Sequence, residues 1–116
     1  MQDYRQLHVW QKAHQLAVDT YGLPHFFRKP EAWPLRDQIL KSVISIPSNI
    51  AEGAGRGSNA DFSRSCWFSM GSCNELESQL LVARDVKFIV PDVHVRFEND
   101  ISSVRRMLTR FIQTLT

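Results

Sequence analysis

The sequence predicts an all-α protein, an antiparallel up-down four-helix bundle made by a single domain over residues 1–116. Apolar residues recur at spacings of three and four in four separate stretches, which is the pattern of helices that bury one face. Clusters of glycine and proline separate these stretches, so the connections are short. A chain of 116 residues suffices for one compact domain, and four amphipathic helices with short connections pack as an antiparallel bundle.

The first helical stretch runs from about Asp3 to Leu23. Its apolar stripe, in steps of three and four residues, consists of Val9, Ala13, Leu16, Thr20 and Leu23, widened by Trp10, Ala17 and Tyr21. Gly22, Pro24 and Pro30 then interrupt the pattern and predict a connection before the second stretch.

The second stretch starts near Glu31 and ends in the glycine-rich segment EGAGRGSN. Its apolar stripe consists of Leu35, Ile39, Val43, Ile46 and Ile50. Pro47 lies inside this stretch and removes the backbone donor that the carbonyl of Val43 would use, so we expect a bent but continuous helix. The glycines then permit the left-handed backbone with which helices often end.

Polar side chains around this proline are expected to support the bend and the end of the helix. Ser45, Ser48 and Asn49 can supply local hydrogen bonds, and Asn49 is also placed to reach a neighbouring helix. Glu52 precedes Arg56 by four residues, the favourable order for an ion pair across one helical turn. A structural role for Glu52 is therefore favoured over a catalytic one.

The third and fourth stretches carry a seven-residue period, which favours helices that cross at shallow angles. The third stripe consists of Phe62, Cys66, Ser69, Cys73, Leu76, Leu80 and Ala83. The fourth consists of Phe97, Ile101, Val104, Leu108, Phe111 and Leu115. Ser58 or Asn59 is predicted to cap the third helix, and Asp92 the fourth. The isolated segment VKFIV between them is the only short strand candidate.

Two cysteines, Cys66 and Cys73, bear on the compartment of the protein. Their spacing of seven places them on one helical face roughly 10 Å apart, too far for a disulfide within the helix. Reduced, buried thiols fit a reducing compartment. The N-terminal segment shows no secretory signal, and no apolar run reaches the length of a membrane span. We expect a cytoplasmic protein that does not enter a membrane.

The motifs that usually carry chemistry are missing from the sequence. The segment GAGRGS lacks the lysine of a phosphate loop, and it has Ser58 where a dinucleotide fingerprint requires glycine. The histidines are scattered, at His8, His14, His25 and His94. We therefore expect no catalytic residue, cofactor or metal ligand. An enzyme would require a cleft with convergent polar groups around Glu52 and Asn49.

Basic residues offer the remaining functional lead, although the formal net charge is only +2. From Val93 to the end, four arginines face two carboxylates, and the second stretch is positive as well. Positive helix faces attract phosphate backbones, and symmetry in an oligomer would multiply such a patch. The predicted contact residues are Lys41, Arg56, Arg105, Arg106 and Arg110. The alternative is a solvated surface with salt bridges between subunits.

The aromatic residues exceed what one slim bundle core requires. The residues in question are Trp10, Trp33, Trp67, Phe68 and Met70. Either they fill a broad core, or they form a second apolar face that is used for self-association. The sequence pattern leaves both interpretations open.

Three segments resemble a known family in order and spacing: LHVWQKAHQLAVDTY, LRDQILKSVISIPSNIAEGAGR and GSCNELESQLLVAR. The chain resembles the bacterial four-helix-bundle proteins of the 23S ribosomal-RNA intervening-sequence family, the S23-like proteins, over nearly its whole length. The segment SIPSNIAEG is the specific part. The signature residues are Pro47, Asn49, Glu52, Gly53 and Arg56. The accessory variability protein of diversity-generating retroelements resembles this family in fold.

This resemblance implies an up-down four-helix bundle that assembles as a homopentameric ring, with no known enzyme activity. It also implies a link to RNA, and the retroelement relative is a basic ring that associates with nucleic acid. We therefore expect a homo-oligomeric scaffold or adaptor whose partners are further copies of itself and RNA or DNA. The alternative is a protein–protein interaction module without nucleic-acid binding.

Overall fold

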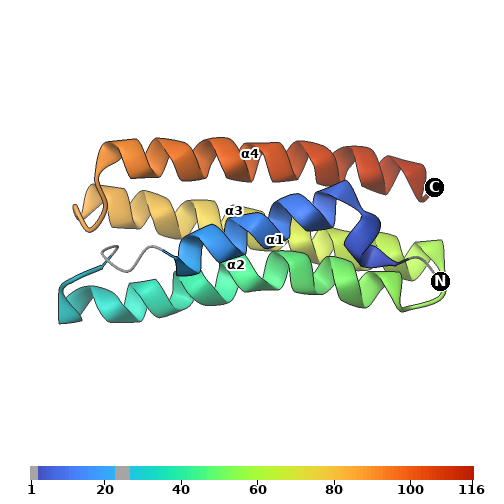
Figure 1. Ribbon diagram of the computed structural model, residues 1–116, viewed down its shortest axis with the longest axis horizontal. Coiled ribbons are helices and arrows are strands. Elements are labelled where there is room, and N and C mark those ends of the chain that lie inside the picture. The colour runs from blue at the N-terminus through green and yellow to red at the C-terminus, as the bar shows by residue number, and fades with distance from the viewer. Residues whose placement is uncertain (1–2, 23–26) are drawn as a thin grey trace.

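The computed structural model describes residues 3–22 and 27–116. Four helices form the bundle: α1 (His8–Tyr21), α2 (Trp33–Ala54), α3 (Asn59–Asp85) and α4 (Pro91–Thr114). Two short 3₁₀ helices, η1 (Tyr4–Gln6) and η2 (Pro30–Ala32), precede α1 and α2. The helices lie side by side in an elongated body of 44 × 20 × 19 Å, with both ends of the chain at one end of it (Figure 1). The predicted all-α, up-down fold is confirmed.

The four helices occupy the corners of a square in chain order. Each packs against its neighbours in this order, and α4 closes the square against α1. Over the described residues, the backbones of the diagonal pairs α1–α3 and α2–α4 do not approach each other closely. The contact between α2 and α3 is the most extensive. Side chains on the outer faces of α2 and α4 therefore lie at opposite corners of the bundle.

The core consists of the apolar stripes that the sequence predicted. All seven positions of the third stripe are buried. In the fourth stripe Phe111 and Leu115 are only partly buried, while Ile112 beside them is buried. The remaining predicted positions that are buried are Val9, Ala13, Leu16, Ala17, Thr20, Ile39, Val43, Ile46, Ile50, Phe97, Ile101, Val104 and Leu108. Leu35 is only partly buried, and Tyr21 is exposed rather than part of the core. Of the predicted first stretch, Leu23 lies outside the described residues, as do Pro24 and His25.

Helix α2 runs without interruption through Pro47, as predicted. Ser45 Oγ donates to the carbonyl of Ser42 at 2.7 Å, and Asn49 Nδ2 donates to the carbonyl of Ser45 at 2.8 Å. These are the local hydrogen bonds predicted for Ser45 and Asn49; within the described residues no hydrogen bond joins Asn49 to a neighbouring helix. The bend at Pro47 stays a prediction.

The helix ends show which capping predictions hold. Ser58 caps α3, with its Oγ accepting from the backbone N–H of Asp61 at 3.2 Å. Asp92 does not cap α4: Val90 is the N-cap, Pro91 takes the first helical position, and Asp92 lies in the first turn. Proline's fixed φ suits that first position, and a carboxylate one residue later still faces the positive end of the helix dipole.

Two further boundaries differ from the sequence prediction. The first helix begins at His8 rather than near Asp3, because Asp3 caps the separate turn η1 and Leu7 is extended. The segment Val86–Val90 is a turn and not a strand. Lys87 adopts a left-handed φ of 65°, and the N–H of Phe88 donates back to the carbonyl of Ala83 at 2.8 Å. This pattern closes α3 in the manner of a Schellman motif.

None of the helices among the described residues combines the length and the apolar character that crossing a bilayer requires.

Candidate functional site

The signature segment of α2 packs closely against α3. A Cβ atom added at Gly53 would lie 2.7 Å from Ser65 Cβ and 2.8 Å from Phe62 Cδ1. Both distances are far below a normal contact, so the two helix backbones approach here in a way that only glycine permits. One turn further along the interface, Ser69 Oγ donates to the carbonyl of Ile46 at 2.8 Å. Gly53, the last residue of the signature segment SIPSNIAEG, therefore lies inside α2 and allows its close packing against α3.

Serine side chains also link α2 to α3, nearer the start of α2 than the contact at Gly53. Ser42 Oγ donates to Glu75 Oε1 at 2.8 Å, and the hydroxyls of Ser45 and Ser72 are 2.6 Å apart. The three serines are buried or half-buried, so these hydrogen bonds replace those that water would otherwise supply to their hydroxyls, whereas Glu75 is exposed. Ser42 and Ser45 thus fasten α2 to α3, and this role was not predicted for the serines of α3.

The end of α2 is closed by the predicted ion pair. Arg56 Nε donates to Glu52 Oε1 at 3.1 Å, and its Nη2 contacts the same oxygen. Both side chains are exposed to solvent. The Glu52 carboxylate beside Arg56 raises the pKa of that guanidinium. Glu52 is therefore an exposed side chain paired with Arg56, and Asn49 is bonded to its own helix.

The remaining chemically capable side chains do not converge in the described parts of the chain. His94 is buried, with Nδ1 3.8 Å from Glu98 Oε2. His14 stacks on Trp10, with ring centroids 4.6 Å apart. Over residues 3–22 and 27–116, no group of three or more metal-binding side chains is arranged around a common point.

The two cysteines are free and buried in the core, as predicted. Burial raises the pKa of the Cys66 thiol to about 11 and that of the Cys73 thiol to about 12. A neutral thiol in the core is a poor nucleophile and a poor metal ligand. These residues serve the packing of α3.

Arg105 lies in the seam between α3 and α4 rather than on an open surface. Its Nη2 donates to Glu77 Oε2 at 2.7 Å, and its Nη1 donates to Asn74 Oδ1 at 2.9 Å. The hydrogen bond from Arg105 lowers the pKa of the Glu77 carboxyl. Of the five predicted nucleic-acid contacts, Arg105 is thus already engaged inside the chain, as Arg56 is.

The outer face of α4 brings two of the predicted basic residues together. Arg106 and Arg110 are exposed one turn apart, and neither forms an ion pair with the described residues. They line a shallow surface groove of about 560 Å³. Its other lining residues are polar: Ser102, Arg105, Thr109 and Gln113. Lys41 is exposed on α2, at the opposite corner of the bundle, so it does not join this face.

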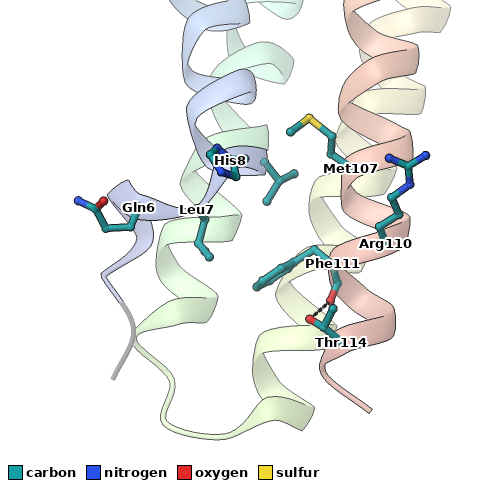
Figure 2. A pocket seen from close by; sticks show the side chains of 8 residues that line it. Gln6, Leu7, His8, Met107, Arg110, Phe111 and Thr114 are labelled. Atoms are coloured by element: carbon teal, nitrogen blue, oxygen red, sulfur yellow. Dashed lines mark hydrogen bonds between the residues drawn. The ribbon is translucent and has the colours of Figure 1, made fainter.

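A second groove, mostly apolar, opens between the start of the chain and the end of α4 (Figure 2). Its volume is about 360 Å³. Leu7 lies on one side of it, and Met107 and Phe111 extend into it from α4. Val9 also lines it. Polar residues complete the lining: Gln6, His8, Arg110 and Thr114. The helix stripes did not predict this groove, because it arises where α1 begins late and leaves the end of α4 partly uncovered.

The surplus aromatic residues divide between the core and the surface. Trp10 is half-buried against Tyr4, with ring centroids 5.1 Å apart, and Met70 is also half-buried. By contrast, Trp67 is 57% exposed and Phe68 60% exposed. Trp10 and Met70 therefore pack against the core, whereas Trp67 and Phe68 form an exposed apolar surface whose use in self-association stays a prediction.

The fold and these surfaces define the class: a slender up-down four-helix bundle whose interior polar groups fasten helix to helix. The chain belongs to the 23S rRNA-intervening sequence protein family, whose sequence pattern matches residues 5–110. It is similar to the crystal structure of a protein of unknown function from the S23 ribosomal protein family of Bacteroides thetaiotaomicron. That likeness has a TM-score of 0.83 at 26% identity, over 90% of this chain and 97% of the other.

Comparison with curated protein sequences gives no match. The relation to the accessory variability protein of retroelements stays a prediction.

Proposed function

We propose that this chain is a non-enzymatic, cytosolic scaffold or adaptor that works as a homo-oligomer and associates with RNA or DNA. The observation that carries the proposal is the outer face of α4, where Arg106 and Arg110 stand exposed beside hydroxyl and amide side chains. Arginine and small polar side chains are the groups that proteins use to contact phosphate oxygens. The printed name of the family, a protein of the 23S rRNA intervening sequence, supports RNA as the first candidate.

The charge of this face is not cancelled by nearby carboxylates. Of the acidic residues in the middle of α4, Glu98 lies beside His94 and Asp100 is 3.5 Å from Lys12 Nζ on α1. Two arginines per copy give only a weak, sequence-independent attraction, since each phosphate contact contributes modestly at physiological salt. Several copies in one assembly would add their contacts, so the homo-oligomer is part of the proposal. A ring of five is the assembly that the resemblance implies.

Binding of a generic single-stranded RNA and of duplex DNA, measured by fluorescence anisotropy between 50 and 200 mM salt, tests the proposal. We expect binding that weakens steeply with salt. The double variant Arg106→Gln/Arg110→Gln should lose most of it. A matched double variant, Arg36→Gln/Arg84→Gln, removes two arginines that each bond the aspartate next to them, and it should bind as the wild type does. Absence of binding by the wild-type oligomer at 50 mM salt would overturn the proposal.

A protein–protein interaction module is the second candidate, favoured by the exposed Trp67 and Phe68. It predicts no binding of RNA or DNA even at low salt. It also predicts a folded protein partner whose binding survives nuclease treatment and is lost in Trp67→Ala/Phe68→Ala. The anisotropy titration therefore separates the two candidates.

A further inference from the structure

Trp67 and Phe68 form a patch on the side of α3 that faces away from the core. The buried positions of α3 follow its heptad stripe, whereas these two neighbours lie across the helix from it and are more than half exposed. Gly71 lies one turn after both. We name Trp67, Phe68 and Gly71 the α3 patch.

Gly71 has no role in the fold of a single chain. A Cβ atom added there would meet nothing within 4 Å, and the residue is helical, with no need for a left-handed backbone. Glycine inside a helix costs roughly 1 kcal/mol relative to alanine. A glycine beside two exposed aromatic rings instead leaves a flat notch, which suits the close approach of another surface.

The α1–α4 groove is the apolar hollow that such a surface could offer. It is formed by Leu7, Val9, Met107 and Phe111, and its volume of about 360 Å³ leaves room for a large aromatic side chain. Its lining includes Arg110 and no carboxylate (Figure 2). The α3 patch, in turn, has the exposed Asp61 two turns before Phe68, with Arg64 between them. The two surfaces are thus both largely apolar, and Asp61 offers a charge opposite to that of Arg110.

The α3 patch and the α1–α4 groove lie at the same height along the bundle. The rings of Phe62 and Phe111 pack with centroids 5.1 Å apart, which ties the start of α3 to the end of α4. Trp67 follows Phe62 by five residues, and Met107 precedes Phe111 by four, so each lies about 6–8 Å from this contact along the axis. A neighbouring copy could therefore bring its patch to the groove by rotation, without a shift along the axis.

We propose that the α3 patch of one copy packs into the α1–α4 groove of the next, as a head-to-tail contact. This rests on the homo-oligomer of the proposed function and names the surfaces that make it. The patch and the groove lie on different sides of the bundle, so the contact is heterologous and repeats from copy to copy. Because it involves no axial shift, it closes into a ring rather than extending into a helical filament.

Two surface variants and their mixture test the contact, with mass measured by light scattering and folding by circular dichroism. Trp67→Ala/Phe68→Ala removes the patch, and Met107→Lys places a charge in the groove. Each variant should remain helical but assemble at least about 30-fold more weakly, as expected for aromatic hot spots. Mixed together, they retain one intact patch and one intact groove. The mixture should therefore form a one-to-one dimer, at twice the chain mass of 13.4 kDa.

Further variants separate this inference from its alternatives. Trp33→Ala removes an exposed tryptophan elsewhere, which packs on Arg36, and it should assemble normally. Gly71→Glu should weaken assembly while the helices stay folded. A two-fold contact of patch against patch would instead leave Met107→Lys assembled with itself, and the mixture would contain no complex between the two variants. That result would overturn the inference.

Different results would overturn the homo-oligomer and the specific contact between patch and groove. A wild-type chain that is monomeric at micromolar concentration would overturn the homo-oligomer of the proposed function and this contact with it. A wild-type oligomer that persists in Trp67→Ala/Phe68→Ala would overturn the contact alone, and would leave the patch free for another protein.

Discussion

Two glycines in neighbouring helices have opposite surroundings, and this difference predicts opposite effects of the same substitution. At Gly53 an added methyl group would overlap Ser65 and Phe62, whereas at Gly71 it would enter open space. We expect Gly53→Ala to lower the free energy of unfolding by about 1–3 kcal/mol, because α2 and α3 must move apart. Gly71→Ala should raise it by up to about 1 kcal/mol through helix propensity.

Urea denaturation of both glycine variants measures this difference. The Trp67→Ala/Phe68→Ala background removes the proposed association, so that the unfolding of single chains is compared. Equal effects of the two substitutions would show that α2 and α3 are not held as closely as their geometry indicates.

The two core thiols give the fold a dependence on alkaline pH. Burial raises the pKa of Cys66 to about 11 and that of Cys73 to about 12, above the ordinary value of 9.0. The unfolded chain therefore loses these protons first as pH rises, and the folded state becomes less favoured. The stability that the neutral thiols contribute is complete below pH 9 and is lost progressively toward pH 11–12.

We expect the free energy of unfolding to fall from pH 8 to pH 10.5 more steeply in the wild type than in Cys66→Ala/Cys73→Ala. Other groups titrate in both proteins, so the difference between the two pH profiles isolates the thiols. Parallel profiles would mean that the thiols are accessible to solvent in the folded chain.

At the scale of the element, two adjacent arginines of α4 have different surroundings and different roles. Arg105 is fixed between Glu77 and Asn74 of α3, whereas Arg106 is exposed. We expect Arg105→Gln to lower the free energy of unfolding at pH 7 by about 1–2 kcal/mol, through the lost charge-assisted hydrogen bonds. Arg106→Gln should leave stability within about 0.5 kcal/mol of the wild type and instead weaken RNA binding.

The Arg105–Glu77 pair also predicts an acid dependence. The hydrogen bond from Arg105 lowers the pKa of Glu77 from its ordinary 4.5, so the unfolded chain binds this proton first as pH falls. The stability from this pair is present above pH 4.5 and is lost at lower pH. Urea midpoints at pH 7 and pH 3.5 should therefore differ less in Arg105→Gln than in Arg106→Gln. Equal differences would contradict a stabilising pair.

Most of the fold could be predicted from the apolar stripes, because the buried face of a helix repeats every three or four residues. The caps were less predictable. Ser58 caps α3, as expected for a hydroxyl side chain that directly precedes a helix. Asp92 does not cap α4, because Pro91 with its fixed φ is the first helical residue. The amide of Asn49 had two partners available, and only the packed structure shows that the carbonyl of Ser45 is the one used.

The candidate surfaces were only partly predictable, since charge in a sequence does not reveal its partner in space. Arg105 and Arg106 are adjacent and look alike, yet a residue 28 positions before Arg105 engages one of them. The α1–α4 groove depends on where a short 3₁₀ turn replaces the first turn of the predicted helix. Neither the length of that turn nor the resulting gap follows from hydrophobic spacing.

At the scale of the whole molecule, the square arrangement separates surfaces with different chemistry. The basic groove lies on the outer face of α4, the α1–α4 groove lies on one side of the bundle, and the α3 patch faces away from the core. A ring built through patch and groove would leave much of the outer α4 face open. Assembly would then repeat the exposed Arg106 once in every copy, with Arg110 at the edge of the contact between patch and groove.

This repetition makes nucleic-acid binding depend on assembly. A single copy offers two arginines on this face, whereas a ring can place several such pairs along one strand, and linked sites can bind 10²–10⁴-fold more tightly than one. We expect Trp67→Ala/Phe68→Ala to bind RNA at least about 100-fold more weakly than the wild type, although its arginines are intact. Its affinity should also fall less steeply with salt, because fewer phosphates are neutralised per binding event.

Anisotropy titrations at several salt concentrations, with the oligomer mass measured on the same samples, give both slopes. Arg106→Gln is the complementary control: Arg106 does not line the α1–α4 groove, so this variant should remain assembled and yet bind RNA more weakly. If the unassembled variant bound RNA with the same affinity and the same slope as the ring, each copy would bind independently. The nucleic-acid surface would then lie on the single bundle, and assembly would serve another purpose.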